Sequence, residues 1–332
     1  MTMVISRTPY RVSFFGGGSD YPAWYLKEGG AVLSTTIDKY CFISCRVLPP
    51  FFHNMKYRVV WSHIESVNGI SEILHPAVRE GLRNAGYTDA DSLEIIHQGD
   101  LPARAGMGSS SSFAVGLLRA LLALRKTEID RHALALRAID LEQNWLKDKV
   151  GSQDQVAPAY GGLNIIRFGT DGEIRVEPLA MDPAVKARLA AHLMLFFTGT
   201  SRMASQVAQT VIENLQVKRQ VIKRMHAMVD EAAAVLRAGD ITAFGDMLHE
   251  AWMLKRSVSE CISNSHIDDL YDQARAAGAT GGKLLGAGSS GFMLFFVPPE
   301  RQPEVLKALK HYLHVPFGFE EAGCQIIYSS IE

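Results

Sequence analysis

A glycine- and serine-rich segment, GMGSSSS at residues 106–112, carries the clearest sign of chemistry in this sequence. We expect it to lie between a strand and a helix that begins near Ser109. Glycines let a backbone approach a ligand closely, and a helix start offers unpaired N–H groups and the positive end of the helix dipole. These features favour a phosphate-binding loop. The alternative is a helix cap with more serines than it needs. No G-K-[ST] closes the segment, so it is not a Walker A loop.

Two further glycine clusters flank this segment at a distance, GGGSD at 16–20 and GGKLLGAGSSG at 281–291. Taken alone, each is explained by a tight turn or a strand-connecting loop. The first does not form a G-x-G-x-x-G that opens a clear helix, which excludes a Rossmann nucleotide site there. The 28 glycines among 332 residues are an ordinary total, so their clustering is the informative property.

Two acidic residues stand out. Glu142 lies in an expected helix among apolar neighbours, and Asp154 lies in the polar stretch GSQDQ at 151–155. Carboxylates are seldom fully buried without a partner. From the residues alone, a surface carboxylate is the better explanation for each.

The pattern of the chain predicts an α+β fold. Strands are expected at 11–15, 31–47, 57–62, 92–97, 163–168, 292–297 and 324–329, and helices at 75–85, 109–124, 131–147, 204–237, 241–260, 266–277 and 300–313. Strands and helices do not alternate as regular βαβ units, which disfavours a doubly wound sheet. The texture changes near residue 180, so we predict an N-terminal domain at 1–180 and a C-terminal domain at 181–332.

The composition excludes several classes of protein. Lys and Arg number 34 against 35 Asp and Glu, which is unlike a nucleic-acid-binding surface. Four cysteines do not make a disulfide framework in a chain of this length. The N-terminus is unlike a signal peptide, and no apolar stretch approaches the roughly 20 residues of a membrane span. We therefore expect a cytoplasmic protein with small-molecule partners and neither a nucleic-acid nor a membrane partner. A homo-oligomer is left open.

The order of the three glycine clusters resembles that of the GHMP kinases, which include galactokinase, homoserine kinase and mevalonate kinase. The first family motif resembles residues 9–21, the second, P-x-x-x-G-x-G-S-S, matches 102–110, and the third, G-x-G-x-x-G, matches 286–291. Within the family, residues 7–21 and 29–40 are most similar to D-glycero-D-manno-heptose 7-phosphate kinases. The kinase portion of L-fucokinase is a near relative. The resemblance implies an N-terminal domain like domain 2 of ribosomal protein S5, a ferredoxin-like C-terminal domain, and an active site between them.

The resemblance also implies roles for individual residues. Asp154 matches the catalytic aspartate, as base or orienting group, and Arg11 the basic residue beside it. Ser110 and Glu142 match the ligands of Mg²⁺. ATP is the implied co-substrate, and its phosphates would meet Pro102, Gly106, Met107, Gly108, Ser109, Ser110, Ser111 and Ser112. The acceptor would meet Gly17, Gly18, Ser19, Asp20, Gly286, Gly288 and Ser289.

The implied reaction is ATP-dependent phosphorylation of the anomeric hydroxyl of D-glycero-D-manno-heptose 7-phosphate to the 1,7-bisphosphate, for nucleotide-activated heptose in surface polysaccharide. Galactokinases carry a Glu-His pair where this chain has Gly17 and Gly18, which would free space for a longer sugar. Candidates to bind the sugar's phosphate are Lys39, Arg104, Arg202, Lys255, Arg256 and Lys283. The alternatives are a kinase acting at position 1 of L-fucose or another hexose, and a sugar sensor without activity. A sensor would be expected to lack Ser110, Glu142 or Asp154.

Overall fold

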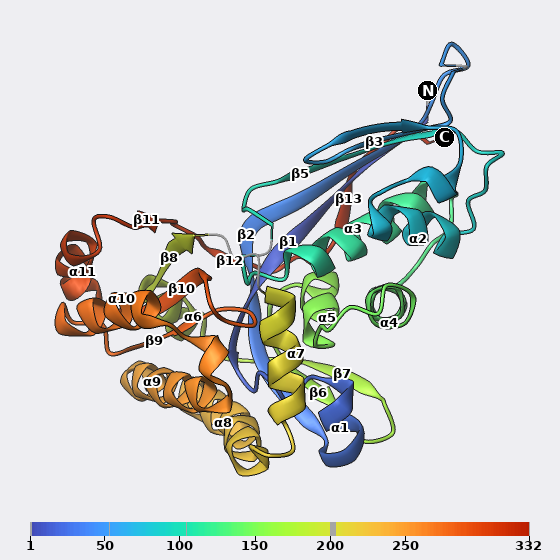
Figure 1. The fold of residues 1–332 in the computed structure, drawn as a ribbon. Coiled ribbons are helices and arrows are strands. Elements are labelled where there is room, and N and C mark those ends of the chain that lie inside the picture. The colour runs from blue at the N-terminus through green and yellow to red at the C-terminus, as the bar shows by residue number, and fades with distance from the viewer. Residues whose placement is uncertain (1, 53, 104, 200–203, 332) are drawn as a thin grey trace.

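The computed structural model of the protein describes residues 2–52, 54–103, 105–199 and 204–331. It contains a nine-stranded sheet, with a continuous path β13-β1-β2-β5-β3-β4 and β6, β7 and β12 attached, and a four-stranded sheet of order β11-β8-β10-β9. Figure 1 shows the two sheets on different sides of the molecule. The predicted α+β class is confirmed.

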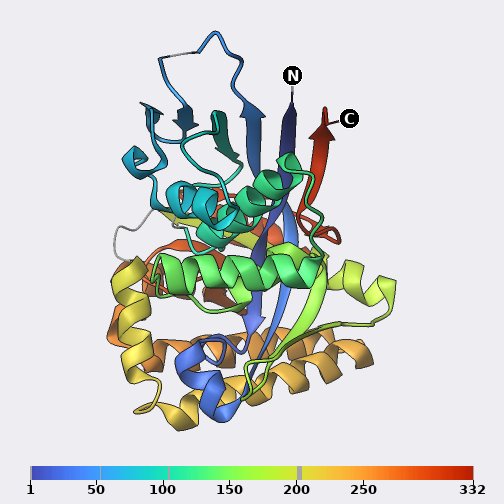
Figure 2. The ribbon, with the colours of Figure 1, turned by 90° about the vertical axis from the view of Figure 1, so that its right-hand side faces the viewer.

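The first sheet is built on two long antiparallel strands, β1 (Met3–Phe15) and β2 (Gly30–Val47). Its other strands are β3 (Tyr57–Val60), β4 (Ile64–Val67), β5 (Leu93–Gly99), β6 (Leu163–Phe168), β7 (Ile174–Pro178), β12 (Phe319–Glu320) and β13 (Gln325–Ser329). The accompanying helices are α1 (Pro22–Glu28), α2 (Pro76–Asn84), α3 (Ser109–Leu124), α4 (Arg131–Asp140) and α5 (Gln153–Tyr160). In Figure 2 the green helices lie across the long strands.

The second sheet contains β8 (Leu193–Gly199), β9 (Gly281–Leu284), β10 (Gly291–Phe296) and β11 (Leu313–His314). Its helices are α6 (Pro183–Ala191), α7 (Ala204–Asn214), α8 (Arg219–Ala238), α9 (Ile241–Val258), α10 (Ser265–Ala276) and α11 (Gln302–Ala308). Short 3₁₀ turns lie at Ile70–Glu72, Glu260–Ile262 and Pro299–Arg301.

The end of the chain returns to the first sheet. Strand β13 pairs antiparallel with β1, with Val4 opposite Ser329, and β12 pairs with β2. The two chain ends therefore lie side by side (Figure 1). The boundary near residue 180 falls between β7 and α6 and stays a prediction, because the last strands belong to the first sheet.

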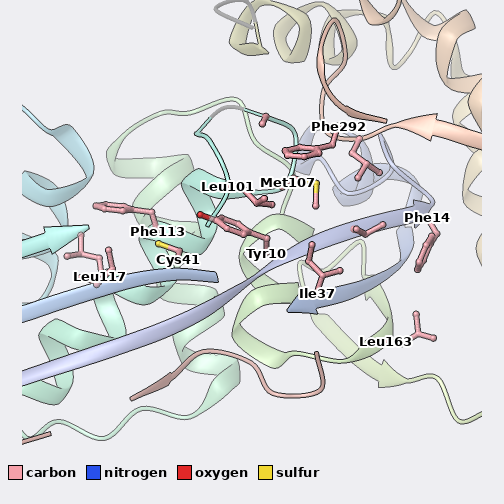
Figure 3. Packing of buried hydrophobic residues seen from close by; sticks show 14 of the residues in the cluster. Tyr10, Phe14, Ile37, Cys41, Leu101, Met107, Phe113, Leu117, Leu163 and Phe292 are labelled. Atoms are coloured by element: carbon pink, nitrogen blue, oxygen red, sulfur yellow. The ribbon is translucent and has the colours of Figure 1, made fainter. Parts of the chain in front are cut away.

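Helix α3 is buried on nearly every face, as its apolar sequence predicts. It approaches β1 so closely that a Cβ on Gly116 would stand 2.6 Å from the Thr8 Oγ1 atom. Phe14 of β1 in turn meets Phe244 of α9 edge to face. One hydrophobic core therefore runs from the first sheet to the helices of the second (Figure 3).

Three elements differ from the expectation. The helix expected over 204–237 is two helices, α7 and α8, although no Pro or Gly separates them. At the break, the Asn214 side chain donates to the Val258 carbonyl after α9, so tertiary contacts set the end of α7. Helix α5 was expected as a loop because it begins with polar residues and contains Pro158. The cluster at 281–291 begins as strand β9.

The second and third glycine clusters pack backbone against backbone. A Cβ on Gly106 would stand 2.4 Å from the Leu285 carbonyl oxygen, and one on Gly286 would stand 2.4 Å from the Gly106 Cα atom. A Cβ on Gly291 would stand 2.4 Å from the Ala105 oxygen. Gly106 and Gly286 also have φ of +81° and +70°. Glycine is required here because a side chain would separate the two loops.

We predict that Gly286→Ala lowers the free energy of unfolding by about 2–4 kcal/mol, from left-handed strain and the backbone overlap. Gly17→Ala is the matched control in another cluster, since a Cβ there meets no described atom within 4 Å. Urea denaturation of both variants measures the difference. Equal midpoints would show that the two loops are not packed as described.

Candidate active site

One ion pair lies at the centre of the candidate site. The Arg11 Nε atom, on β1, donates to Asp154 Oδ1 at 2.9 Å, and its Nη2 donates to Oδ2 at 2.9 Å. Its Nη1 donates to the Gly106 carbonyl oxygen at 2.7 Å. Arg11 is buried, whereas the Asp154 side chain keeps 17% of its surface exposed. A single guanidinium thus joins β1, the first turn of α5 and the 106–112 loop, and leaves the carboxylate accessible.

The 106–112 loop leads directly into α3. Gly108 is the N-cap residue in a left-handed conformation with φ of +71°, and no side chain among the described residues caps this helix. Met107 anchors the loop in the core near Leu101 and Phe292 (Figure 3), and the Ser112 hydroxyl donates to the Pro9 carbonyl. The loop therefore presents glycine backbone and a helix N-terminus, the arrangement that binds phosphate groups.

Glu142 is a buried carboxylate next to this helix start. It lies in a π-helical turn, Leu141–Trp145, that follows α4. The Ser111 hydroxyl donates to its Oε2 at 2.5 Å, and the Gln155 amide donates to the same oxygen. Burial raises the pKa of Glu142 to about 7, and hydrogen bonds from Ser111, Gln155 and Ser110 oppose this rise. Within the described ranges no Lys, Arg or His forms an ion pair with this carboxylate.

The surroundings of Glu142 fit a hard divalent cation. The described part of the chain has no cluster of three His, Cys, Asp or Glu side chains that could hold a metal alone. Mg²⁺ takes few protein ligands and completes its shell with phosphates and water. A buried carboxylate that lacks a cationic partner, the neighbouring Ser110 hydroxyl and the Gln155 Oε1 atom, which is buried with no described partner, supply suitable oxygens.

Asp20 lies beside Asp154 on the other side of the site. The Gly18 N–H donates to its Oδ1 at 3.0 Å and the Gln153 amide donates to its Oδ2 at 2.8 Å. Burial, together with the charge of Asp154, raises the pKa of Asp20 to about 6. A Cβ on Gly151 would stand 1.9 Å from Asp20 Oδ2. Gly151 therefore allows this carboxylate to lie against the loop before α5.

Several residues expected at the site have other surroundings. The Ser19 hydroxyl is buried and bonded to the carbonyls of Gly16 and Ala31 within its own turn. Gly286 packs on Gly106, whereas Gly288 and Ser289 pack on Ile262. The third cluster thus supports the phosphate loop from behind. Pro102 is exposed near the start of that loop.

The basic residues proposed for a sugar phosphate separate into groups. Lys39 and Arg256 form surface ion pairs with Asp38 and Asp268. Arg104 and Arg202 lie outside the described residues. Lys255 and Lys283 point into the interior and donate to backbone carbonyls.

Sequence reasoning assigned no role to Gln153 and Gln155, although both flank Asp154 in the sequence. Gln153 binds Asp20 and Gln155 binds Glu142, so the two glutamines link the three carboxylates of the site. The repeated pattern of an amide on each side of Asp154 was the available signal.

Comparisons with known proteins agree with this geometry. The model for the GHMP kinases N terminal domain matches residues 72–162, and that for the GHMP kinases C terminal matches 232–314. A D-glycero-alpha-D-manno-heptose 7-phosphate kinase of Campylobacter jejuni is 27% identical over 93% of this chain and 94% of its own. A bifunctional fucokinase/GDP-fucose pyrophosphorylase of Arabidopsis thaliana is 26% identical over 90% of this chain, which covers 30% of that protein.

Solved structures give the same result. The crystal structure of a D-glycero-D-manno-heptose 1-phosphate kinase from Bacteroides thetaiotaomicron superposes with a TM-score of 0.80, 26% identity, and coverage of 98% of this chain and 100% of that one. Galactokinase from Lactococcus lactis superposes with a TM-score of 0.73 at 16% identity, covering 97% of this chain and 95% of that one. The second likeness concerns the fold alone.

The fold and the matches define a phosphotransferase whose acceptor is an alcohol group and whose co-substrate is ATP. The chain belongs to the GHMP kinases. No helix in the described ranges is long and apolar enough to cross a bilayer.

The raised pKa of Asp20 predicts a dependence of stability on pH. A carboxyl whose folded pKa lies above its unfolded value stabilises the fold at low pH, and this contribution is lost as the pH rises through about 6. Asp20→Asn should therefore raise the free energy of unfolding at pH 8 by up to about 3 kcal/mol. The buried Gln153 Oε1, which lacks a described partner, can accept from the new amide after a flip of the Gln153 side chain.

The measurement is urea denaturation of Asp20→Asn and the wild type at pH 8 and pH 5. The advantage of the variant should shrink at pH 5. Asp272→Asn, which alters an exposed carboxylate on α10, serves as control and should change little at either pH. An advantage of Asp20→Asn that is equal at both pH values would contradict the assignment.

Proposed function

We propose that this chain phosphorylates the anomeric hydroxyl of D-glycero-D-manno-heptose 7-phosphate with ATP and gives the 1,7-bisphosphate. The observation that carries the proposal is the partly exposed Asp154 carboxylate, fixed by Arg11 between Asp20 and the phosphate-loop geometry of 106–112. The names of the Campylobacter and Bacteroides relatives both contain a phosphorylated heptose, which supports this choice of substrate. The product would feed nucleotide-activated heptose, and the reaction would occur in the cytoplasm.

The loop and helix start are proposed to bind the phosphates of ATP. Backbone N–H groups after Gly106 and Gly108 face a phosphate without side chains between, and the α3 dipole favours negative charge there. Ser110 and Glu142 would hold Mg²⁺, which when bound would neutralise phosphate charge. Ser111 and Gln155 position the Glu142 carboxylate from behind.

The transfer step is a direct displacement at phosphorus. The sugar oxygen forms a bond to the γ-phosphorus, the bond from that phosphorus to the bridging oxygen breaks, and ADP leaves. The hydroxyl proton passes to Asp154, or Asp154 only orients the hydroxyl. Asp20 would accept hydrogen bonds from neighbouring sugar hydroxyls and so fix the acceptor in line. Arg11 spends three nitrogens on Asp154 and the Gly106 carbonyl, which supports a positioning role.

A hexose 1-kinase is the second candidate for the function. The open space at Gly17, where a Cβ would meet no described atom within 4 Å, favours a larger acceptor than a hexose. A sensor without activity is disfavoured because Asp154, Glu142 and Ser110 are all present and arranged around one site.

The test of the function is a panel of sugars with ATP and Mg²⁺, followed by ³¹P NMR for an anomeric phosphate. The panel contains D-glycero-D-manno-heptose 7-phosphate, the unphosphorylated heptose, L-fucose, galactose and mannose. The proposal expects the heptose 7-phosphate to have the highest kcat/KM. Turnover of fucose without turnover of the heptose phosphate would replace the proposal with the second candidate.

Loss of the Asp154 carboxylate should abolish most activity. Asp154→Asn is expected to lower kcat by about 10²-fold or more, on the scale of a lost general base. Asp246→Asn, an exposed carboxylate on α9, is the matched control and should keep full activity. Steady-state kinetics with the active substrate of the panel measures both. A rate for Asp154→Asn within a few-fold of the wild type would remove Asp154 from the reaction.

The raised pKa of Glu142 predicts competition between protons and Mg²⁺. Because this carboxylate titrates at about pH 7 in the metal-free protein, the Mg²⁺ concentration for half-maximal activity should rise as the pH falls below 7, by up to about tenfold per unit. Titrations of Mg²⁺ at pH 6 and 8 test this. Glu142→Gln should need more Mg²⁺ at both pH values and lose that pH dependence. Identical pH dependence in the variant would place the titrating group elsewhere.

A further inference from the structure

Two lysines from the second sheet and its helices reach the interior beside the candidate site. Lys283 of β9 is 5% exposed and its Nζ donates to the Phe14 carbonyl at the end of β1, at 2.7 Å. The Lys255 Nζ of α9 donates to the carbonyls of Leu284 and Gly286 at 2.8 and 2.6 Å. Both ammonium groups are thus held by backbone oxygens at the contact between the two sheets.

Neither lysine has an acidic partner. In the part of the chain that the structure describes, no carboxylate lies within ion-pair distance of either Nζ. Burial lowers the pKa of Lys283 to about 7, aided by the charge of Arg11, and lowers that of Lys255 well below its usual value, aided by Lys283 and Arg11. A buried ammonium without an anion is costly, so these two residues require an explanation.

The position of the two lysines points to an anion on the acceptor side of the site. Phe14 comes directly before the turn that carries Asp20, and Lys283 lies within electrostatic reach of Asp20. Ser110 and Glu142, by contrast, belong to α3 and the π-helical turn after α4. An ammonium carries three N–H donors. Since Lys283 uses one and Lys255 uses two on carbonyls, three N–H groups remain for an anion.

We propose that Lys283 and Lys255 bind a phosphoryl group, and that this group is the phosphate already present on the sugar acceptor. The assignment rests on the proposed function for the identity of the sugar. It explains why two cations without carboxylate partners are retained in the interior, and it makes a phosphorylated sugar the preferred class of acceptor. The γ-phosphate of ATP is the other source of the same chemistry, and the test separates the two.

The first arm of the test uses inorganic phosphate as the probe and needs no substrate. Isothermal titration of the wild type, Lys283→Met and Lys255→Met measures its binding in the presence of saturating ADP and Mg²⁺, which occupy the nucleotide site. Lys307→Met on α11 is the matched control, since Lys307 is an exposed lysine. We expect at least tenfold weaker phosphate binding in Lys283→Met and Lys255→Met and no change in Lys307→Met. Equal binding by all four proteins would overturn the proposal.

The second arm compares acceptors with and without phosphate. Lys283→Met should raise KM for the heptose 7-phosphate at least tenfold, with KM for ATP and kcat/KM for the unphosphorylated heptose within about twofold of the wild type. Lys283→Arg should restore part of the affinity. A rise in KM for ATP alone would assign the lysines to the nucleotide and overturn the acceptor assignment. Equal losses with both sugars would show a purely structural role.

The two proposals can fail separately. If the wild type phosphorylates the heptose 7-phosphate but Lys283→Met affects both sugars equally, the lysine assignment fails and the proposed function stands. If the wild type phosphorylates only unphosphorylated sugars, the proposed function fails and the acceptor-phosphate assignment fails with it. Thermal unfolding of each variant confirms that it is folded, and Met is chosen because it fills a similar volume without a charge.

Discussion

The two-pronged ion pair between Arg11 and Asp154 is the interaction on which the rest of the site depends. It fixes the carboxylate of α5 to β1, and the third nitrogen of the same guanidinium holds the Gly106 carbonyl. Breaking a buried pair leaves an uncompensated charge and is strongly destabilising. The strand, the helix and the phosphate loop are therefore held in one arrangement, and the distance between a bound phosphate and the carboxylate is set by this one side chain.

Small residues make that arrangement possible. Gly106 and Gly286 allow the loops of the two sheets to meet backbone to backbone, and Gly151 makes room for Asp20 beside the start of α5. The near-zero net charge of the chain conceals a local distribution in which Arg11, Lys255 and Lys283 approach Asp20 and Asp154 in one interior. Positive charge is concentrated at a pocket for small anions rather than spread over a surface.

Local pattern predicts some of this structure and not the rest. The continuous apolar run of α3 and the serines before it indicated a buried helix with a phosphate loop, and that helix is present. Helix α5 was missed because its polar start and internal Pro158 resemble a loop. It is held by tertiary contacts, through Asp154 to Arg11 and Gln155 to Glu142, which no local pattern contains. For the same reason Glu142 alone indicated only a surface carboxylate.

Candidate residues of one chemical type were separated only by burial and partners. Six basic residues fitted a sugar phosphate by type. Of the four that lie in described ranges, two form surface ion pairs and two enter the interior. The third glycine cluster was assigned to the acceptor by its family motif, yet its Gly286 supports the phosphate loop. Sequence order identifies such loops, whereas the face that each presents to the ligand depends on packing across the two sheets.

The central claim is direct transfer of a phosphoryl group to a sugar hydroxyl oriented by a carboxylate that cannot itself attack. Both Asp154 oxygens accept from Arg11 at 2.9 Å, which opposes their use as a nucleophile. The most direct measurement is the stereochemical course at phosphorus with ATP made chiral at the γ-phosphate by oxygen isotopes. The structure predicts inversion of configuration, as a single in-line displacement requires. Retention would reveal a covalent phosphoenzyme intermediate and contradict this account.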